Sequence, residues 1–142
     1  MHRDALVGTW QLMAMETRFE DGTVEKSYGP HCDGRLHYGA DGRVAAHLWD
    51  PDRHGTDVDR PDPAYFSYTG RWEMVGPRMH HHVDAATHAT WTDSVVTREV
   101  SQDRADLLFT AAVKFAGKAG TALLRWRKLP PVTMEYDVPG QT

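Results

Sequence analysis

Four residues of the chain carry side chains suited to acid–base chemistry on a bound small molecule. His47 and His81 have imidazole groups, which exchange protons near neutral pH. Arg98 and Tyr38 add hydrogen-bond donors that polarise a carbonyl group or stabilise an enolate. Each histidine has an alternative role as a satisfied core residue. Arg98 has an alternative role as the partner of Glu16 in a structural ion pair.

The turn expected at Asp41-Gly42 sets the register of the two stretches that flank it. If these two residues form the whole loop, Tyr38 lies opposite Ala45, and Tyr38 shares one face with His47 and Trp49. That face is more aromatic than the opposite face, so we expect it to point into the protein.

A second turn, at Gly76-Pro77, decides which of the three consecutive histidines point inward. It places Trp72 opposite His81, so His81 points inward and its neighbours His80 and His82 point outward. The two outward histidines could share a metal ion, but no carboxylate follows at the spacing that such a site needs. We therefore expect no metal site.

A third turn, at Asp103-Arg104, places Arg98 as the single charge on an otherwise apolar face. Trp10, if buried, brings Glu16 inward along the first strand. We expect Trp10 to plug one end of the protein beneath a basic residue, Lys128 or Arg125. The expected interior thus holds the catalytic candidates His47, His81, Arg98 and Tyr38, and the substrate-contacting candidates Glu16, Trp49, Tyr68, Trp72, Phe109 and Trp126.

The elements that must position these side chains are short β-strands. Alternating apolar and polar residues recur about every ten residues between turn signals, and helical patterns are nearly absent. A chain of 142 residues supports one hydrophobic core. We predict one all-β domain, residues 1–130, followed by a surface tail, residues 131–142, with the loop Asp50–Pro63 able to cover an opening. The expected strands are Gly8–Phe19, Thr23–Ser27, Gly34–Gly39, Arg43–Trp49, Ser67–Val75, Arg78–Asp84, Ser94–Ser101, Ala105–Phe115 and Thr121–Leu129.

The first predicted strand opens with a Gly-x-Trp motif, Gly8-Thr9-Trp10, and other short motifs follow in order. They are Asp21-Gly22 with Tyr28-Gly29-Pro30, Gly34-x-Leu36-x-Tyr38, Pro51-Asp52-Arg53, Tyr65-x-x-Tyr68-x-Gly70-x-Trp72, His81-His82-Val83, Trp91, Arg98 and Leu124-x-Trp126. Together they resemble the bacterial and fungal lipocalin-like domain family of the calycin superfamily. The chain departs from that family at Ala89–Asp93, where a Pro-Asn-Trp-x-Gly-like segment is usual, and at His47, where many relatives carry Gln.

The resemblance implies a single antiparallel up-and-down lipocalin-like β-barrel of about eight to ten strands with an internal ligand cavity. Calycin barrels of this size include ligand carriers as well as cyclases and isomerases, so the resemblance implies the fold more closely than the function.

Composition excludes several other classes of protein. A hydrophobic content of 40% and a net charge of −4 are typical of a globular chain. The 16 Lys and Arg residues are scattered among 20 Asp and Glu residues, so we expect no nucleic-acid partner. No apolar run approaches the roughly 20 residues that span a bilayer, and no signal-peptide core follows Met1. We therefore expect a cytoplasmic protein with no membrane partner, and the lone Cys32 excludes an internal disulfide.

These observations lead to a functional hypothesis and one alternative. The hypothesis is a cofactor-independent cyclase or isomerase of specialised metabolism that acts on a hydrophobic molecule inside the barrel. His47 and His81 would act as general acid and base, and Arg98 with Tyr38 or Tyr68 would stabilise an enolate. The alternative is a non-catalytic carrier whose polar groups orient a ligand. The oligomeric state stays open, with a homodimer through a barrel edge or the tail as one alternative.

Overall fold

The computed structural model describes residues 2–53, 65–115 and 117–133. Within these residues it contains nine strands, one short α-helix and one 3-10 helix. In chain order they are α1 (Arg3–Leu6), β1 (Gly8–Phe19), β2 (Val24–Glu25), β3 (Asp33–Tyr38), β4 (Arg43–Trp49), β5 (Tyr65–Val75), β6 (Arg78–Ala86), η1 (Ala89–Trp91), β7 (Val95–Asp103), β8 (Asp106–Phe115) and β9 (Lys118–Lys128). All nine lie where the sequence predicts strands.

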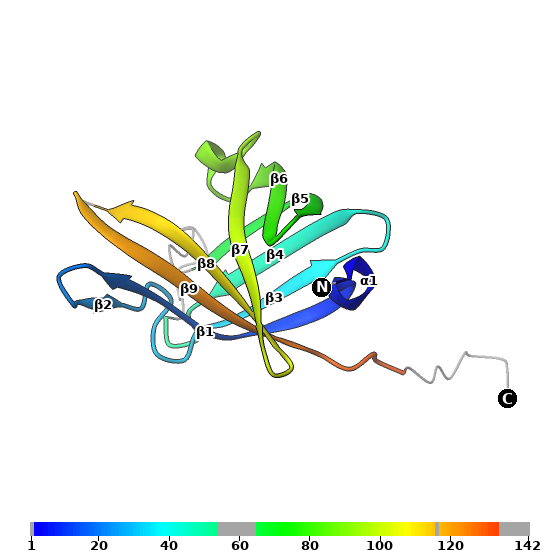
Figure 1. Cartoon of the computed structure of the whole chain (residues 1–142), viewed down its shortest axis with the longest axis horizontal. Coiled ribbons are helices and arrows are strands. Elements are labelled where there is room, and N and C mark those ends of the chain that lie inside the picture. Colours follow the sequence, from blue (N-terminus) through cyan, green and yellow to red (C-terminus); the bar gives the residue numbers. More distant parts are fainter. Residues whose placement is uncertain (1, 54–64, 116, 134–142) are drawn as a thin grey trace, which may run out of the picture.

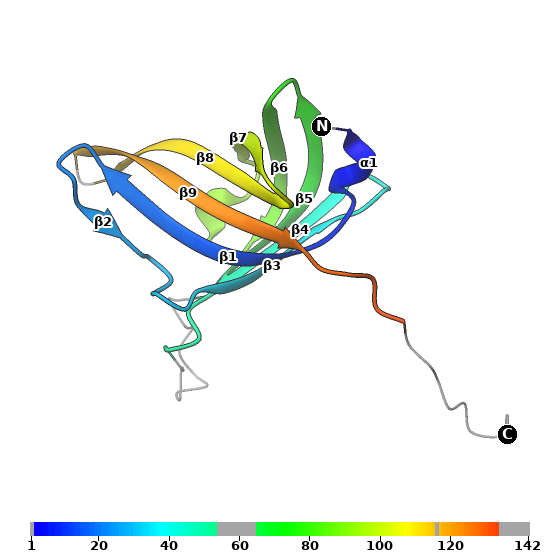
Figure 2. The ribbon, with the colours of Figure 1, turned by 60° about the horizontal axis from the view of Figure 1, so that its bottom comes forward.

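The strands form one antiparallel sheet that closes on itself (Figures 1 and 2). Strand β1 pairs with β3 on one side and with β9 on the other, and β2 adds a short pairing at the end of β1. The other eight strands therefore make a closed barrel in the order β1-β3-β4-β5-β6-β7-β8-β9. Closure removes the sheet edges, and the architecture is the predicted antiparallel barrel.

One end of the barrel is closed by Trp10 and the helix α1. The indole Nε1 of Trp10 donates a hydrogen bond to the Leu6 carbonyl oxygen at 2.9 Å, and Leu6 is fully buried. The Lys128 ammonium lies 5.7 Å from the centre of the Trp10 ring, which confirms the expected basic residue over this plug. The Arg3 guanidinium of α1 lies in the same way over Trp72, at 4.6 Å.

Strands β3 and β4 pair one residue out of the expected register. The Gly39 N–H donates to the Arg43 carbonyl oxygen at 2.8 Å, so the loop contains three residues, 40–42, instead of two. Its last residue, Gly42, has a φ of 87°, the left-handed conformation that commonly ends a three-residue hairpin loop. Tyr38 consequently lies opposite Val44, and not opposite Ala45.

A slip of one residue turns every side chain of β4 to the other face of the sheet. The residues of β4 that point inward are Val44, Ala46 and Leu48, all of them buried. The prediction that His47 and Trp49 face inward is therefore wrong, because it assumed a loop of two residues where the structure has three.

A β-bulge in β1 has a similar effect. Leu12 pairs with Trp126 of β9, but the next pair is Ala14 with Arg125, so Met13 is the extra residue. Beyond the bulge the inward face passes to Met15, Thr17 and Phe19. The prediction that Glu16 faces inward is wrong for this reason.

The other two hairpins keep the predicted faces. Trp72 lies opposite His81 across the Gly76-Pro77 turn, as expected. The turn expected at Asp103-Arg104 would place Val100 opposite Leu107, but β7 and β8 are shifted by two residues and Val100 lies opposite Phe109. A shift of two leaves each side chain on its original face, and Arg98 stays on the same side as Phe109.

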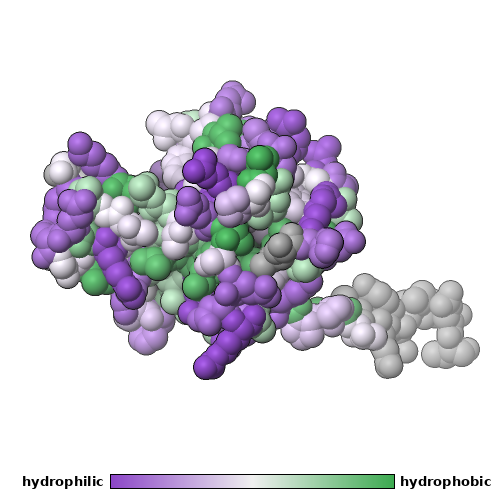
Figure 3. Space-filling model, in the orientation of Figure 1, coloured by the Kyte–Doolittle hydropathy of each residue, from purple (hydrophilic) through white to green (hydrophobic). Residues whose placement is uncertain are grey.

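The view in Figure 3 shows a surface covered mostly by hydrophilic residues, with apolar residues in small groups. The buried apolar side chains of the strands form one cluster inside the barrel. Of the expected covering loop Asp50–Pro63, residues 54–63 lie outside the described residues, as do residues 134–142 of the expected tail. None of the helices in the described residues is long and apolar enough to cross a membrane.

Candidate functional site

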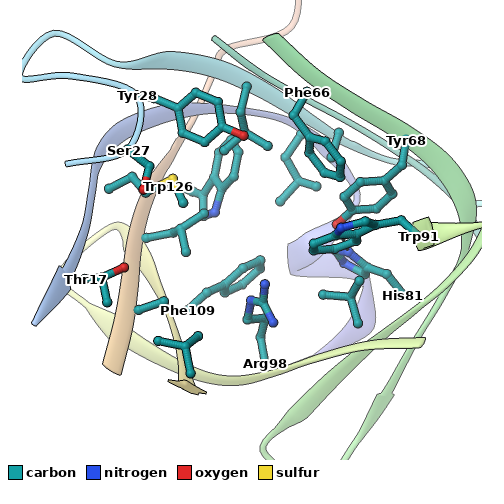
Figure 4. Close-up of a pocket in the computed structure, with 18 of the residues that line it drawn as sticks. Thr17, Ser27, Tyr28, Phe66, Tyr68, His81, Trp91, Arg98, Phe109 and Trp126 are labelled. Carbon is teal, nitrogen blue, oxygen red and sulfur yellow. Dashed lines mark hydrogen bonds between the residues drawn. The ribbon is translucent and has the colours of Figure 1, made fainter. Parts of the chain in front are cut away.

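The barrel contains a partly open cavity of about 470 Å³ (Figure 4). Its lining is mainly apolar, with Leu36, Ala46, Leu48, Phe66, Val96 and Phe109 among the contributors. Cavities of this size and character hold small organic ligands. The 3-10 helix η1 adds Trp91, whose ring stacks on Tyr68 with 6.1 Å between the ring centres.

Within this apolar lining, His81 is held between two tyrosines. The Tyr38 hydroxyl lies 2.6 Å from Nε2 of His81, and the Tyr68 hydroxyl lies 2.6 Å from Nδ1. The three residues come from β3, β5 and β6, and all three are buried. His81 and Tyr68 line the cavity, whereas Tyr38 is not part of the lining and contacts it through His81.

Burial keeps this trio uncharged. It lowers the pKa of His81 to about 3, and the positive charge of Arg98 contributes in the same direction. Burial also raises the pKa of both tyrosine hydroxyls above the ordinary value of 10.0. At neutral pH the cavity therefore contains a neutral imidazole and two neutral phenols.

Arg98 brings a positive charge to the same wall. Figure 4 shows its guanidinium group pointing into the cavity from β7. Burial lowers the pKa of Arg98 below its ordinary value, yet an arginine stays protonated in proteins. Its one hydrogen bond within the described residues is from Nη1 to the Thr97 carbonyl oxygen, at 3.0 Å.

The alternative in which Glu16 neutralises Arg98 does not hold. Glu16 accepts a hydrogen bond from Arg18 at 2.7 Å on the outer side of β1. Across the described part of the chain, no carboxylate oxygen lies within 4.0 Å of the Arg98 guanidinium. Arg98 also borders a hollow on the outer face of the barrel, where the ladder between β7 and β8 ends at the pair Glu99–Thr110. This position explains how an unpaired cation is tolerated in the wall.

Comparison with known proteins identifies the family to which this chain belongs. The family described as "Lipocalin-like domain" matches residues 7–129, which is most of the chain. The chain belongs to the lipocalin-like domain family. The fold is also similar to the solution structure of a lipocalin, the product of the gene Q83, whose expression is activated by cell transformation by the myc oncogene. That match has 11% sequence identity and a TM-score of 0.46, and covers 94% of this chain and 76% of the other. No curated protein matches the chain.

In this lipocalin-like domain, three of the four catalytic candidates lie in or directly behind the cavity wall, and the fourth lies outside the barrel. His81 and Arg98 line the cavity, and Tyr38 contacts His81 from behind. His47 instead lies on the outer face, where its Nδ1 is 2.9 Å from the Ser67 hydroxyl. An acid–base pair of His47 and His81 across the cavity is therefore not present.

The expected substrate-contacting residues divide in the same way. Tyr68, Phe109 and Trp126 line the cavity. Trp72 is buried but packs on the Tyr38 ring, 4.7 Å between centres, and its Nε1 donates to the Gly39 carbonyl oxygen. Trp49 lies outside, and Glu16 is outside as described above. The β1 bulge and the β4 register account for these two differences.

Several lining residues were not expected from the sequence. Met15 and Thr17 enter the lining because of the β1 bulge, which no local sequence signal marks. Trp91 was noted as a motif residue without a role, and its contact with Tyr68 joins residues that are far apart in the sequence. Two exposed residues of opposite charge, Glu25 and Lys114, also contribute to the lining.

Proposed function

We propose that this lipocalin-like domain binds a small, largely apolar molecule inside its barrel. The observation that carries the proposal is the cavity of about 470 Å³ with its mainly apolar lining. A ligand that buries about 200 Å² of apolar surface there gains about 5 kcal/mol from leaving water, before the cost of association. The family and the fold support the same general function.

Filling the cavity from one wall tests this proposal. Ala46 of β4 is buried and lines the cavity, whereas its neighbour Ala45 faces outward. We expect a neutral solvatochromic dye to bind the wild type at one saturable site, and Ala46→Phe to weaken binding by about tenfold or more through lost volume. Ala45→Phe adds the same side chain outside the barrel and should leave binding unchanged. Equal dye binding by both variants, with unchanged melting temperatures, contradicts binding in the cavity.

A second candidate function is catalysis, specifically cyclisation of a bound carbonyl compound. Tyr68 and Arg98 favour it, because both present donors to the same cavity and donors placed in advance stabilise a developing oxyanion. A nucleophile within the substrate would attack the carbonyl carbon while the π electrons move to oxygen. The proton that the nucleophile releases would then return to that oxygen. Folding the substrate inside the barrel would bring the two groups together.

Cyclisation suits this lining better than isomerisation does. Isomerisation through an enolate needs a base that removes a proton from carbon. Among the described lining residues the one carboxylate is Glu25, which is exposed on β2. The neutral His81 is a weak base because its pKa is about 3. A substrate that supplies its own nucleophile needs no such base.

The fate of the bound molecule distinguishes a carrier from an enzyme. A carrier returns its ligand unchanged, as mass spectrometry of the extracted ligand would show. An enzyme converts a candidate substrate, and Tyr68→Phe should then lower turnover about 100-fold, the effect of removing one oxyanion donor. Recovery of unchanged substrate from the wild type rules out the catalytic candidate and leaves the carrier.

A further inference from the structure

Two side chains that line the cavity, Trp126 and Arg98, have N–H groups for which the described residues supply no acceptor. Trp126 is buried, and its indole Nε1–H has no hydrogen-bond partner within the described residues. Protein atoms cover this nitrogen almost completely, although the Trp126 ring lines the cavity (Figure 4). Arg98 has five N–H groups, and the described structure uses one of them, on the Thr97 carbonyl oxygen. The buried Trp126 N–H without an acceptor costs free energy. Arg98 is partly exposed, so it favours a ligand with acceptor atoms through its positive charge, which has no carboxylate partner among the described residues.

The hydrogen bonds among Tyr38, His81 and Tyr68 add a third donor to the cavity. Only one direction of donation along the three side chains leaves no buried hydrogen without a partner. A neutral imidazole has one N–H and one acceptor nitrogen, so one tyrosine donates to His81 and the other accepts from it. Tyr38 is 2% exposed, and His81 Nε2 is its hydroxyl's one hydrogen-bond partner within the described residues. If Tyr38 accepted, its own hydroxyl hydrogen would be buried without a partner.

Tyr38 therefore donates to Nε2, and His81 Nδ1–H donates to the Tyr68 oxygen. The Tyr68 hydroxyl hydrogen is then free, and Tyr68 lines the cavity. The burial that keeps His81 neutral supports this direction, since an imidazolium would donate to both tyrosines. The relay Tyr38–His81–Tyr68 thus ends as a donor aimed at the ligand.

We propose that the ligand of this cavity is an apolar molecule with a carboxylate, whose oxygens accept hydrogen bonds from Tyr68 and Arg98. The inference rests on the proposed binding function and deepens it. The negative charge would neutralise Arg98, for which the described chain supplies no carboxylate partner. An alcohol of the same shape would bring a donor of its own and no charge. The planar fork of an arginine also matches the two oxygens of a carboxylate.

A matched pair of aromatic probes tests the proposal. Isothermal titration at neutral pH compares 2-naphthoic acid, which is ionised, with 2-naphthalenemethanol, which is neutral. We expect the acid to bind about tenfold or more tightly, as charge-assisted hydrogen bonds would give. Arg98→Met should abolish this preference and keep alcohol binding, and Tyr68→Phe should reduce it. Arg78→Met makes the same charge change at an exposed position and should preserve it.

The direction of the relay has its own readout, which does not depend on any ligand. ¹⁵N chemical shifts of the His81 ring, assigned by their loss in His81→Gln, should show a proton on Nδ1 and none on Nε2 at neutral pH. The opposite tautomer or an imidazolium overturns the proposed relay.

The two experiments separate failure of the proposal from failure of the general function. If the alcohol binds as tightly as the acid, binding in the barrel stands and the carboxylate proposal falls. If neither probe nor the neutral dye binds, the proposed function itself fails. If a variant does not fold, the comparison of acid and alcohol binding by the wild type and the tautomer measurement still test the proposal.

Discussion

Acid should destabilise this domain through His81. In the folded protein, burial lowers the pKa of His81 from 6.5 to about 3, with the Arg98 charge acting in the same direction. The unfolded chain regains the ordinary value. Between these two values the unfolded state binds a proton that the folded state does not, so the free energy of unfolding falls as the pH falls. The contribution is fully retained above pH 6.5 and lost progressively down to about pH 3.

The size of the effect follows from the same two values. Each pH unit inside the window costs about 1.4 kcal/mol for one group. From about pH 7.5 to about pH 5, His81 should therefore remove about 2 kcal/mol of stability. Most carboxylates stay ionised over this range, which isolates the histidine contribution.

Urea denaturation followed by tryptophan fluorescence measures this loss at both pH values. His81→Gln removes the titrating group, so the variant should lose about 2 kcal/mol less than the wild type on acidification. His80→Gln changes the outward neighbour, which contacts Thr97, and should lose as much as the wild type. Equal losses in the wild type and His81→Gln would refute the reasoning, because His81 would then not be held neutral by burial.

Three further substitutions test the barrel wall and the outward face. Gly70→Ala should cost about 3 kcal/mol or more in urea denaturation, since a Cβ there would clash with the His82 carbonyl oxygen. Gly76→Ala, in a turn with open space and a φ of 59°, should cost about 1 kcal/mol, and equal costs would contradict the clash. Asp106→Asn should lower the free energy of unfolding by about 1 kcal/mol at neutral pH. Hydrogen bonds from the β9 arginines hold the carboxyl pKa below 3.8, so wild type and variant should converge as the pH falls through that lowered value. His47→Ala should leave dye affinity within about twofold of the wild type, and a tenfold loss would mean that His47 reaches the cavity.

Much of the fold could be read from local sequence. Period-two alternation and turn residues depend on neighbours along the chain, so they predicted all nine strands and the all-β class, and the family resemblance implied the closed barrel. The inward direction of His81 was also predictable, because Gly76-Pro77 forms a two-residue turn and no bulge separates it from His81. Arg98 was assigned correctly even with a shifted register, since a shift of two residues preserves the faces.

Errors arose where one extra residue entered a loop or a strand. The loop after Tyr38 has three residues, and this alone moved His47 and Trp49 to the outside. The bulge at Met13 depends on the pairing of β1 with β9, about a hundred residues away in the chain. Local propensities carry no information about that pairing.

The sequence by itself determined the strands and the all-β class, because these follow from alternation and turn chemistry, and its motifs implied the closed barrel through the resemblance to lipocalin-like domains. Only the tertiary structure decided that Tyr38 and Tyr68 meet the two nitrogens of His81, across separations of 43 and 13 residues. It also decided that Arg98 has no described carboxylate partner, because the bulge turns Glu16 away. Barrel closure sets these contacts, and the geometry of closure depends on loop lengths and bulges summed around the whole sheet.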